Sequence, residues 1–123
     1  MKINIKATNL ELTTELENYL RERIEYFDKL IDGNPDAEGL MQVELARETM
    51  HHKQGVIFRA EYNLRANGKN FRAVATEEDI RAAIDMARDE LTREITSAKQ
   101  KKATLVRRGA RRVKDFLKGF YKR

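Results

Sequence analysis

Two adjacent histidines, His51 and His52, are the side chains of this sequence best suited to acid-base catalysis or metal binding. Catalysis of that kind needs a base that is held against an oriented partner residue. These histidines stand between Glu48 and Gly55, in a segment that we expect to form a loop, where neighbouring side chains usually point apart. We expect a solvated loop tip there, and a ligand contact or a weak metal site is the alternative.

The sequence lacks the short motifs that mark phosphate loops, dinucleotide sites and zinc peptidases. It contains no GxGxxG, no GxxxxGK followed by Ser or Thr, and no HExxH. It also contains no cysteine, which excludes a thiol nucleophile and a disulfide framework and is typical of a reducing compartment. We predict a protein that is not an enzyme and that uses no cofactor, no metal ion and no small-molecule substrate.

The distribution of charge along the chain is more informative than its total. The 123 residues have a net charge of +5. Residues 1–98 hold 14 Lys and Arg against 19 Asp and Glu, a net charge of −5, whereas residues 99–123 hold 11 basic residues against one Asp, a net charge of +10. A mildly acidic body with a strongly basic tail indicates a polyanionic partner. No long apolar run and no apolar signal region are present, so we expect neither a membrane span nor secretion.

The spacing of apolar residues predicts the elements that position these charges. Alternation with a period of two predicts four strands, at residues 2–7, 41–46, 56–64 and 71–75. Asn67 and Gly68 separate the last two strands and are typical of a tight hairpin turn.

Helical spacing of apolar residues predicts two helices. The first follows a Thr13 cap and ends by Gly33, and the second opens at residues 76–79, with Thr76 as its cap, and continues to about Ala98. The order is β-α-β-β-β-α, with one apolar face on each strand and one apolar stripe on each helix. We predict an α+β fold in which both helices cover one face of a four-stranded sheet.

The two edges of the second helix carry opposite charge. At about 100° per residue, one flank of its apolar stripe holds Arg81, Arg88 and Lys99, and the other flank holds Glu90 and Glu94. A cationic row of this kind can follow a phosphate backbone. For residues 81–93, pairs within the helix are the alternative, such as Asp85 with Arg88 or Asp89 with Arg93.

Arg23 is the unusual residue of the first helix, because it falls inside the apolar stripe. Burial of an unpaired guanidinium in such a place costs free energy unless the aliphatic part of the side chain packs against apolar neighbours and the charged group reaches the edge of the core. Pairing with Glu22, Glu25 or a loop acid is one interpretation, and contact with phosphate is the other.

The basic tail combines apolar residues at roughly helical spacing with arginines and lysines. Two glycines and the scarcity of acids suggest that it is disordered, or becomes helical only on a partner. Its composition suits RNA and an anionic membrane surface equally well.

Three stretches resemble the ribosome hibernation promoting factors and their ribosome-associated inhibitor relatives: MKINIKATNLELTTELENYLRERI, VELARETMHHKQGVIFRAEYNL and EEDIRAAIDMARDELTREI. Residues 78–85 carry the most specific signature, and the likeness extends over residues 1–102, with residues 103–123 as an unusual basic tail on a short-type member. The resemblance implies the fold given above, similar to a double-stranded RNA-binding domain. It also implies binding to the small ribosomal subunit across the decoding region, at the A and P sites, which silences idle ribosomes under stress or in stationary phase.

The resemblance implies that the basic, RNA-contacting positions of the family correspond in this chain to Arg23, Lys29, Arg93, Lys99, Lys101 and Lys102. Tyr26, Glu90 and Ser97 stand where members often have Lys, and Glu94 stands where Gln is usual, which weakens the expected phosphate contacts. Our hypothesis is that the tail compensates by entering an RNA groove. The full set of residues expected to bind ribosomal RNA is Arg23, Lys29, Arg81, Arg88, Arg93, Lys99, Lys101, Lys102, Arg107, Arg108, Arg111 and Arg112.

The resemblance therefore implies a cytoplasmic, ribosome-associated protein whose partner is the small subunit with its ribosomal RNA, and which we expect to be monomeric off the ribosome. Two alternatives stay open. One is a general RNA-binding module without preference for ribosomes, and the other is a protein whose amphipathic tail docks to an anionic membrane.

Overall fold

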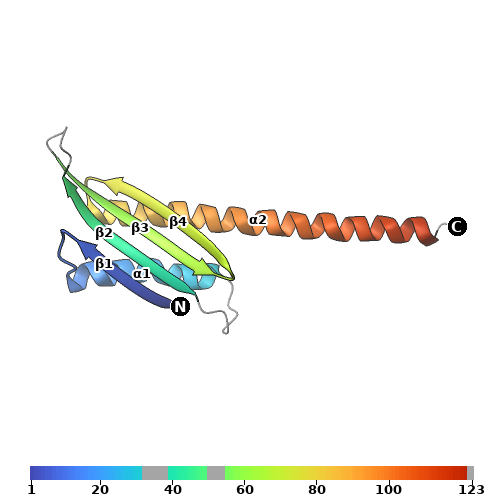
Figure 1. Cartoon of the computed structure of the whole chain (residues 1–123), viewed down its shortest axis with the longest axis horizontal. Helices are drawn as coiled ribbons and strands as arrows, with labels where there is room; N and C mark the ends of the chain where they lie inside the picture. The colour runs from blue at the N-terminus through green and yellow to red at the C-terminus, as the bar shows by residue number, and fades with distance from the viewer. Residues whose placement is uncertain (32–38, 50–54, 122–123) are drawn as a thin grey trace.

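The computed structural model describes residues 1–31, 39–49 and 55–121, with side chains described as far as Arg111. Its elements follow the predicted order β-α-β-β-β-α, which confirms the α+β fold class (Figure 1). The elements are β1 (Lys2–Thr8), α1 (Thr14–Leu30), β2 (Leu40–Thr49), β3 (Val56–Ala66), β4 (Lys69–Glu77) and α2 (Ile80–Tyr121).

The strands form one mixed sheet in the order β1-β2-β3-β4. β1 pairs with β2 in parallel because α1 connects them, and the remaining neighbours are antiparallel. Side chains alternate between the two faces of the sheet, so that Met41, Val43 and Leu45 of β2 are all buried on one face. Both helices cover this same face, as Figure 1 shows with the sheet in front of them.

A tight turn joins β3 to β4, as the sequence predicts. Asn67 and Gly68 both have positive φ, at 54° and 74°, and Ala66 pairs with Lys69 across the turn. This backbone matches the right-handed twist of the two strands, and Asn and Gly adopt it most readily.

α1 begins where the sequence predicts. The Thr13 hydroxyl accepts a hydrogen bond from the Leu16 amide at 3.1 Å, which satisfies one of the free donors at the start of the helix. The apolar stripe packs on the sheet, and Leu20, Ile24 and Phe27 are completely buried. Burial of three such side chains is worth several kcal/mol, on the order of 2 kcal/mol each.

α2 begins later than the sequence suggests, and Thr76 is not its cap. β4 continues its pairing with β3 to Glu77, so Thr76 lies within the sheet, opposite Arg59. The Asp79 carboxylate instead accepts a hydrogen bond from the Arg81 amide at 3.3 Å. The predicted stripe that follows is confirmed, because Ile84, Leu91 and Ile95 are buried against the sheet.

The second half of α2 extends away from the sheet (Figure 1). Every residue from 99 to 111 is exposed, and Leu105 and Val106 are 65% and 63% exposed. The helical backbone continues through Gly109 to Tyr121, and residues 99–121 span about 35 Å at 1.5 Å per residue. A division between residues 1–102 and 103–123 stays a prediction, and the structure adds that the backbone of the second segment is helical as far as Tyr121.

Candidate nucleic-acid interface

A cluster of polar side chains joins α1 to α2 along their line of contact. The Tyr19 hydroxyl donates to one oxygen of Asp85 at 2.5 Å, and the Arg23 Nε donates to the other oxygen at 3.1 Å. The Arg23 guanidinium carbon lies 3.4 Å from the centre of the Tyr19 ring, and that of Arg81 lies 5.1 Å from it. We call Tyr19, Arg23, Arg81 and Asp85 the interhelical cluster.

Within this cluster, Arg23 reaches the edge of the core from inside the apolar stripe. Its guanidinium pairs with Glu22 as well as Asp85, both at 3.1 Å, and its side chain is 22% exposed. Burial raises the pKa of Tyr19 above its ordinary value of 10.0, and the Asp85 carboxylate that accepts its hydrogen bond adds to that rise. Arg23 is therefore positioned by the fold, and its contact with phosphate stays a prediction.

The predicted basic flank of α2 faces α1. Arg81 lies beside Tyr19 at one end of the helix contact, and the Lys99 ammonium donates to the Leu30 carbonyl at the other end. Carbonyls at the end of a helix carry partial negative charge, which favours a cation there. The two cations are separated by about 27 Å along α2, at 1.5 Å per residue.

Arg88, on the same flank, forms an ion pair at 3.2 Å with Asp89, while Asp85 turns toward α1. The predicted alternative of an Asp85 to Arg88 pair is therefore replaced by a pair between the two helices. Lys29, in the last turn of α1, is exposed.

Arg93 and Lys101 lie on the other side of α2. Together with Phe71 of β4 they line a shallow hollow whose wall also includes Glu90 and Glu94. Acidic and basic side chains share this surface, so its attraction for a polyanion is weaker than that of a purely basic one. The weakening of phosphate contacts by the acids of α2 stays a prediction.

The described cations beyond the sheet are exposed. Arg107, Arg108 and Arg111 are exposed on the extended part of α2. Arg112 belongs to the same helix, and its side chain lies outside the described residues, as do His51 and His52.

Sequence reasoning missed three residues of this surface. Two of them, Tyr19 and Asp85, orient Arg23. Asp85 could have been found from the sequence, because it is the last residue of the signature at residues 78–85. Nothing in the sequence indicated the third residue, Lys69, because only the packing of the hairpin brings it to the same cavity as Lys99.

In the described ranges, no three His, Asp or Glu side chains gather closely enough to hold a metal ion. None of the helices described combines the length and hydrophobicity needed to cross a membrane.

The sequence of the chain is similar to a protein family and to individual proteins of that family. The family model described as sigma 54 modulation protein / S30EA ribosomal protein matches residues 3–103. A ribosome hibernation promoting factor of Azotobacter vinelandii is 29% identical over 101 residues, covering 82% of this chain and 85% of that protein. One of Pseudomonas putida is 28% identical over 112 residues, covering 91% of this chain and 100% of that protein.

Solved structures agree with this similarity. The N-terminal domain of Thermus thermophilus Protein Y superposes with a TM-score of 0.62 at 26% identity, covering 77% of this chain and 96% of that one. A ribosomal subunit interface protein of Coxiella burnetii, at 11% identity, shares the fold with a TM-score of 0.65, covering 81% and 99%. Because the family model spans most of its length, the chain belongs to the sigma 54 modulation protein / S30EA ribosomal protein family, which includes the ribosome hibernation promoting factors.

Proposed function

We propose that this protein is a ribosome hibernation factor, which binds the small ribosomal subunit across the decoding region and silences idle ribosomes without performing chemistry. Binding to the small subunit is the known role of its family, and its relatives bear the name of hibernation factors. The observation that carries the proposal is the row of cations from Arg23 and Arg81 to Lys99, on a fold that this family shares.

The rigidity of this surface supports binding to structured RNA. Asp85 fixes the Arg23 guanidinium against the Tyr19 ring, so little side-chain freedom remains to be lost on binding. The N–H groups of this guanidinium that Asp85, Glu22 and the Tyr19 carbonyl do not engage can donate to phosphate oxygens. The row would position the protein through the RNA backbone, with no need to recognise base sequence.

The extended part of α2 supplies the long-range attraction. Because residues 1–98 have a net charge of −5, the body of the protein does not draw the protein toward RNA by itself. We propose that residues 103–123 enter an RNA groove, with Arg107, Arg108 and Arg111 on phosphates, and that this contact compensates for Glu90 and Glu94.

We also propose that the protein acts in the cytoplasm and is monomeric when it is not on the ribosome. Its sequence has no cysteine, in keeping with a reducing compartment, and its tail is strongly basic, so that copies aligned side by side would repel one another.

A sucrose-gradient profile of stationary-phase cells tests the proposal. We expect the protein to travel with small subunits or whole ribosomes, and treatment with high salt should release it to the top of the gradient. If it stays at the top in low salt, or follows bulk RNA instead of ribosomes, the assignment is wrong.

A second candidate rests on the exposed Leu105 and Val106, which lie among arginines as in a membrane-surface helix. Flotation with anionic vesicles distinguishes it. Binding to vesicles in the absence of any ribosome binding would favour membrane docking.

A further inference from the structure

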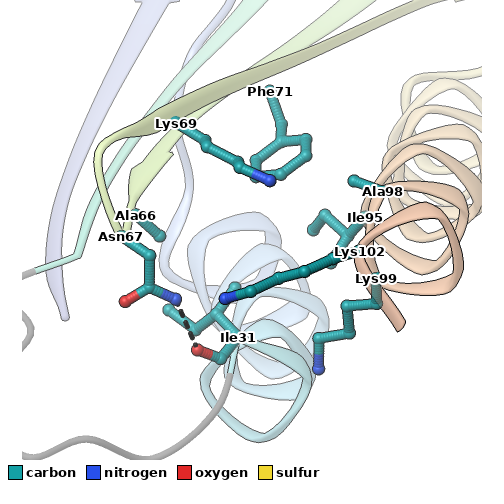
Figure 2. A pocket seen from close by; sticks show the side chains of 9 residues that line it. All are labelled: Ile31, Ala66, Asn67, Lys69, Phe71, Ile95, Ala98, Lys99 and Lys102. Atoms are coloured by element: carbon teal, nitrogen blue, oxygen red, sulfur yellow. Dashed lines mark hydrogen bonds between the residues drawn. The ribbon is translucent and has the colours of Figure 1, made fainter. Parts of the chain in front are cut away.

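A small cavity lies where three elements meet: the C-terminal end of α1, the β3-β4 hairpin and α2 (Figure 2). Its volume is about 110 Å³. The residues that line it are Ile31, Ala66, Asn67, Lys69, Phe71, Ile95, Ala98, Lys99 and Lys102. This set of described residues includes three lysines and no acid, unlike the mixed surface on the other side of α2.

The three lysines come from two elements. Lys69 is the first residue of β4, and Lys99 and Lys102 lie one turn apart on α2. Figure 2 shows Lys69 on the hairpin side of the cavity, and Lys99 and Lys102 on the α2 side. Lys99 is anchored to the Leu30 carbonyl, so its charge has a fixed place beside the cavity. An anion in this cavity would face positive charge from opposite walls.

The rest of the wall is apolar and includes a flat ring. Phe71 contributes its phenyl ring, and Ile95 and Ala98 contribute aliphatic surface from α2. A single inorganic anion gains nothing from such a wall, and a purely apolar ligand gains nothing from three ammonium groups. A nucleotide combines the two requirements, since its base is flat and its phosphate is anionic.

The cavity is also held open by the fold. Asn67 donates from its side-chain amide to the Ile31 carbonyl at 3.3 Å, which ties the hairpin turn to the end of α1. The turn itself is restricted by the positive φ of Asn67 and Gly68. The walls are therefore positioned before a ligand arrives, which reduces the entropy lost on binding.

We propose that this cavity binds one unstacked nucleotide of single-stranded RNA. The base lies against Phe71 and Ala98, and its phosphate lies between Lys69 and Lys102. The volume admits one group of about the size of a base, and the open side lets the rest of the strand leave. This inference rests on the proposed function, since the strand would belong to ribosomal RNA, and it adds a site separate from the interhelical cluster.

Binding of fluorescent RNA to the full-length protein tests the site, with three competitors. These are a hexamer of uridylate, a hexamer with the same phosphates and no bases, and uridine monophosphate. We expect the base-bearing hexamer to bind about tenfold more tightly than the baseless one, because stacking of one base contributes that much. Phe71→Leu should abolish this ratio and leave the affinity for the baseless hexamer unchanged.

Charge variants test the phosphate contact. Lys69→Gln and Lys102→Gln should each weaken both hexamers and lower the slope of log affinity against log salt by about 0.7. Lys6→Gln removes the same charge from the opposite face of the sheet and should change affinity less than either. Lys102 is exposed, so its variant keeps the fold and the test valid.

Equal affinity for the two hexamers would overturn the proposal, because the lysines would then form only a charged patch. Binding of uridine monophosphate as tightly as the hexamer would overturn the RNA source and point to a free nucleotide. The proposed function fails separately. If the wild-type protein does not bind small subunits, the function is wrong, whereas full subunit binding by Phe71→Leu together with an unchanged hexamer ratio rejects the pocket alone.

Discussion

Asp85 of α2 links the two helices through two side-chain hydrogen bonds. It accepts hydrogen bonds from Tyr19 of α1 and from Arg23 of α1, at sequence separations of 66 and 62 residues. Its carboxylate is about one-third exposed, so the two bonds form near the surface and are partly screened by solvent. Loss of the Asp85 charge would leave Glu22 as the acidic partner that the described contacts give the Arg23 guanidinium at the edge of the core.

We predict that Asp85→Asn lowers the free energy of unfolding by about 1 kcal/mol, because a neutral amide replaces the charged acceptor of both bonds. Thermal unfolding followed by circular dichroism measures the change, which corresponds to a few degrees in Tm. Asp89→Asn is the matched control, since Asp89 is exposed and pairs only with neighbouring Arg88 among the interactions described. A loss of stability in the control as large as that in Asp85→Asn would contradict this account.

Glu61 gives the stability of the protein a pH dependence. It accepts from Arg72 at 2.6 Å and from Arg59 at 3.0 Å on the sheet face opposite the helices. Burial by itself raises the pKa of Glu61, but the bond from Arg72 and the charge of Arg59 outweigh burial, so the pKa is lowered from 4.5. A lowered pKa in the folded state stabilises the fold above the unfolded pKa, and that stabilisation is lost as the pH falls through the folded pKa.

We therefore predict that wild type exceeds Glu61→Gln in free energy of unfolding by up to about 1 kcal/mol at pH 7, and that this difference disappears at pH 2 to 3. Urea denaturation at the two pH values measures it, and comparison with the variant cancels the titration of the other acids. A difference of the same size at both pH values would show that Glu61 does not stabilise the fold through its charge.

At the scale of elements, α2 has two parts with different environments. The part that ends near Ala98 is covered by the sheet on its apolar stripe, whereas residues 99–111 are exposed throughout. An isolated helix of this length is only marginally stable in water, so the extended part depends on its continuity with the packed part and on any partner that it binds.

We predict that replacing Arg107, Arg108, Arg111 and Arg112 together with Gln weakens binding to the small subunit and lowers its salt dependence. If all four contact phosphates, the slope of log affinity against log salt falls by about 3. Thermal unfolding should change little, because the described members of this set make no contact with the core. Unchanged affinity and slope would reject the role of the extension in RNA binding.

The features that the sequence predicted correctly are those governed by neighbours in the chain. Alternation placed the four strands, Thr13 capped α1, and the Asn67-Gly68 turn formed as expected. Thr76 was assigned wrongly as a cap because pairing with β3 decides where β4 ends, and that pairing is not local.

The candidate site was less predictable, because its contacts join distant segments. Asp85 pairs with Arg23, 62 residues away, although Arg88 lies one turn away on the same helix. Lys69 shares a cavity with Lys99 and Lys102 only because the hairpin and α2 pack over the end of α1. Helical periodicity correctly placed Arg81 and Lys99 on one flank, but it contains no information on which element that flank would face.

In the whole molecule, the folded body and the extended part of α2 carry opposite net charge. In the proposed function, the fixed cations along α1 and α2 contact the RNA, and the basic extension, with its net charge of +10, draws the acidic body toward it. If the protein binds in this way, its effect on translation depends on what it excludes from the site.

Competition on purified small subunits between this protein and labelled transfer RNA bound with its messenger tests whether the protein occupies the decoding region. We predict that the wild-type protein excludes the transfer RNA in proportion to the fraction of subunits that it occupies. The variant with four arginines replaced should do so only at higher concentration. If the protein and transfer RNA occupy the same subunits together, with neither lowering the affinity of the other, the protein does not bind across the decoding region and the account is wrong.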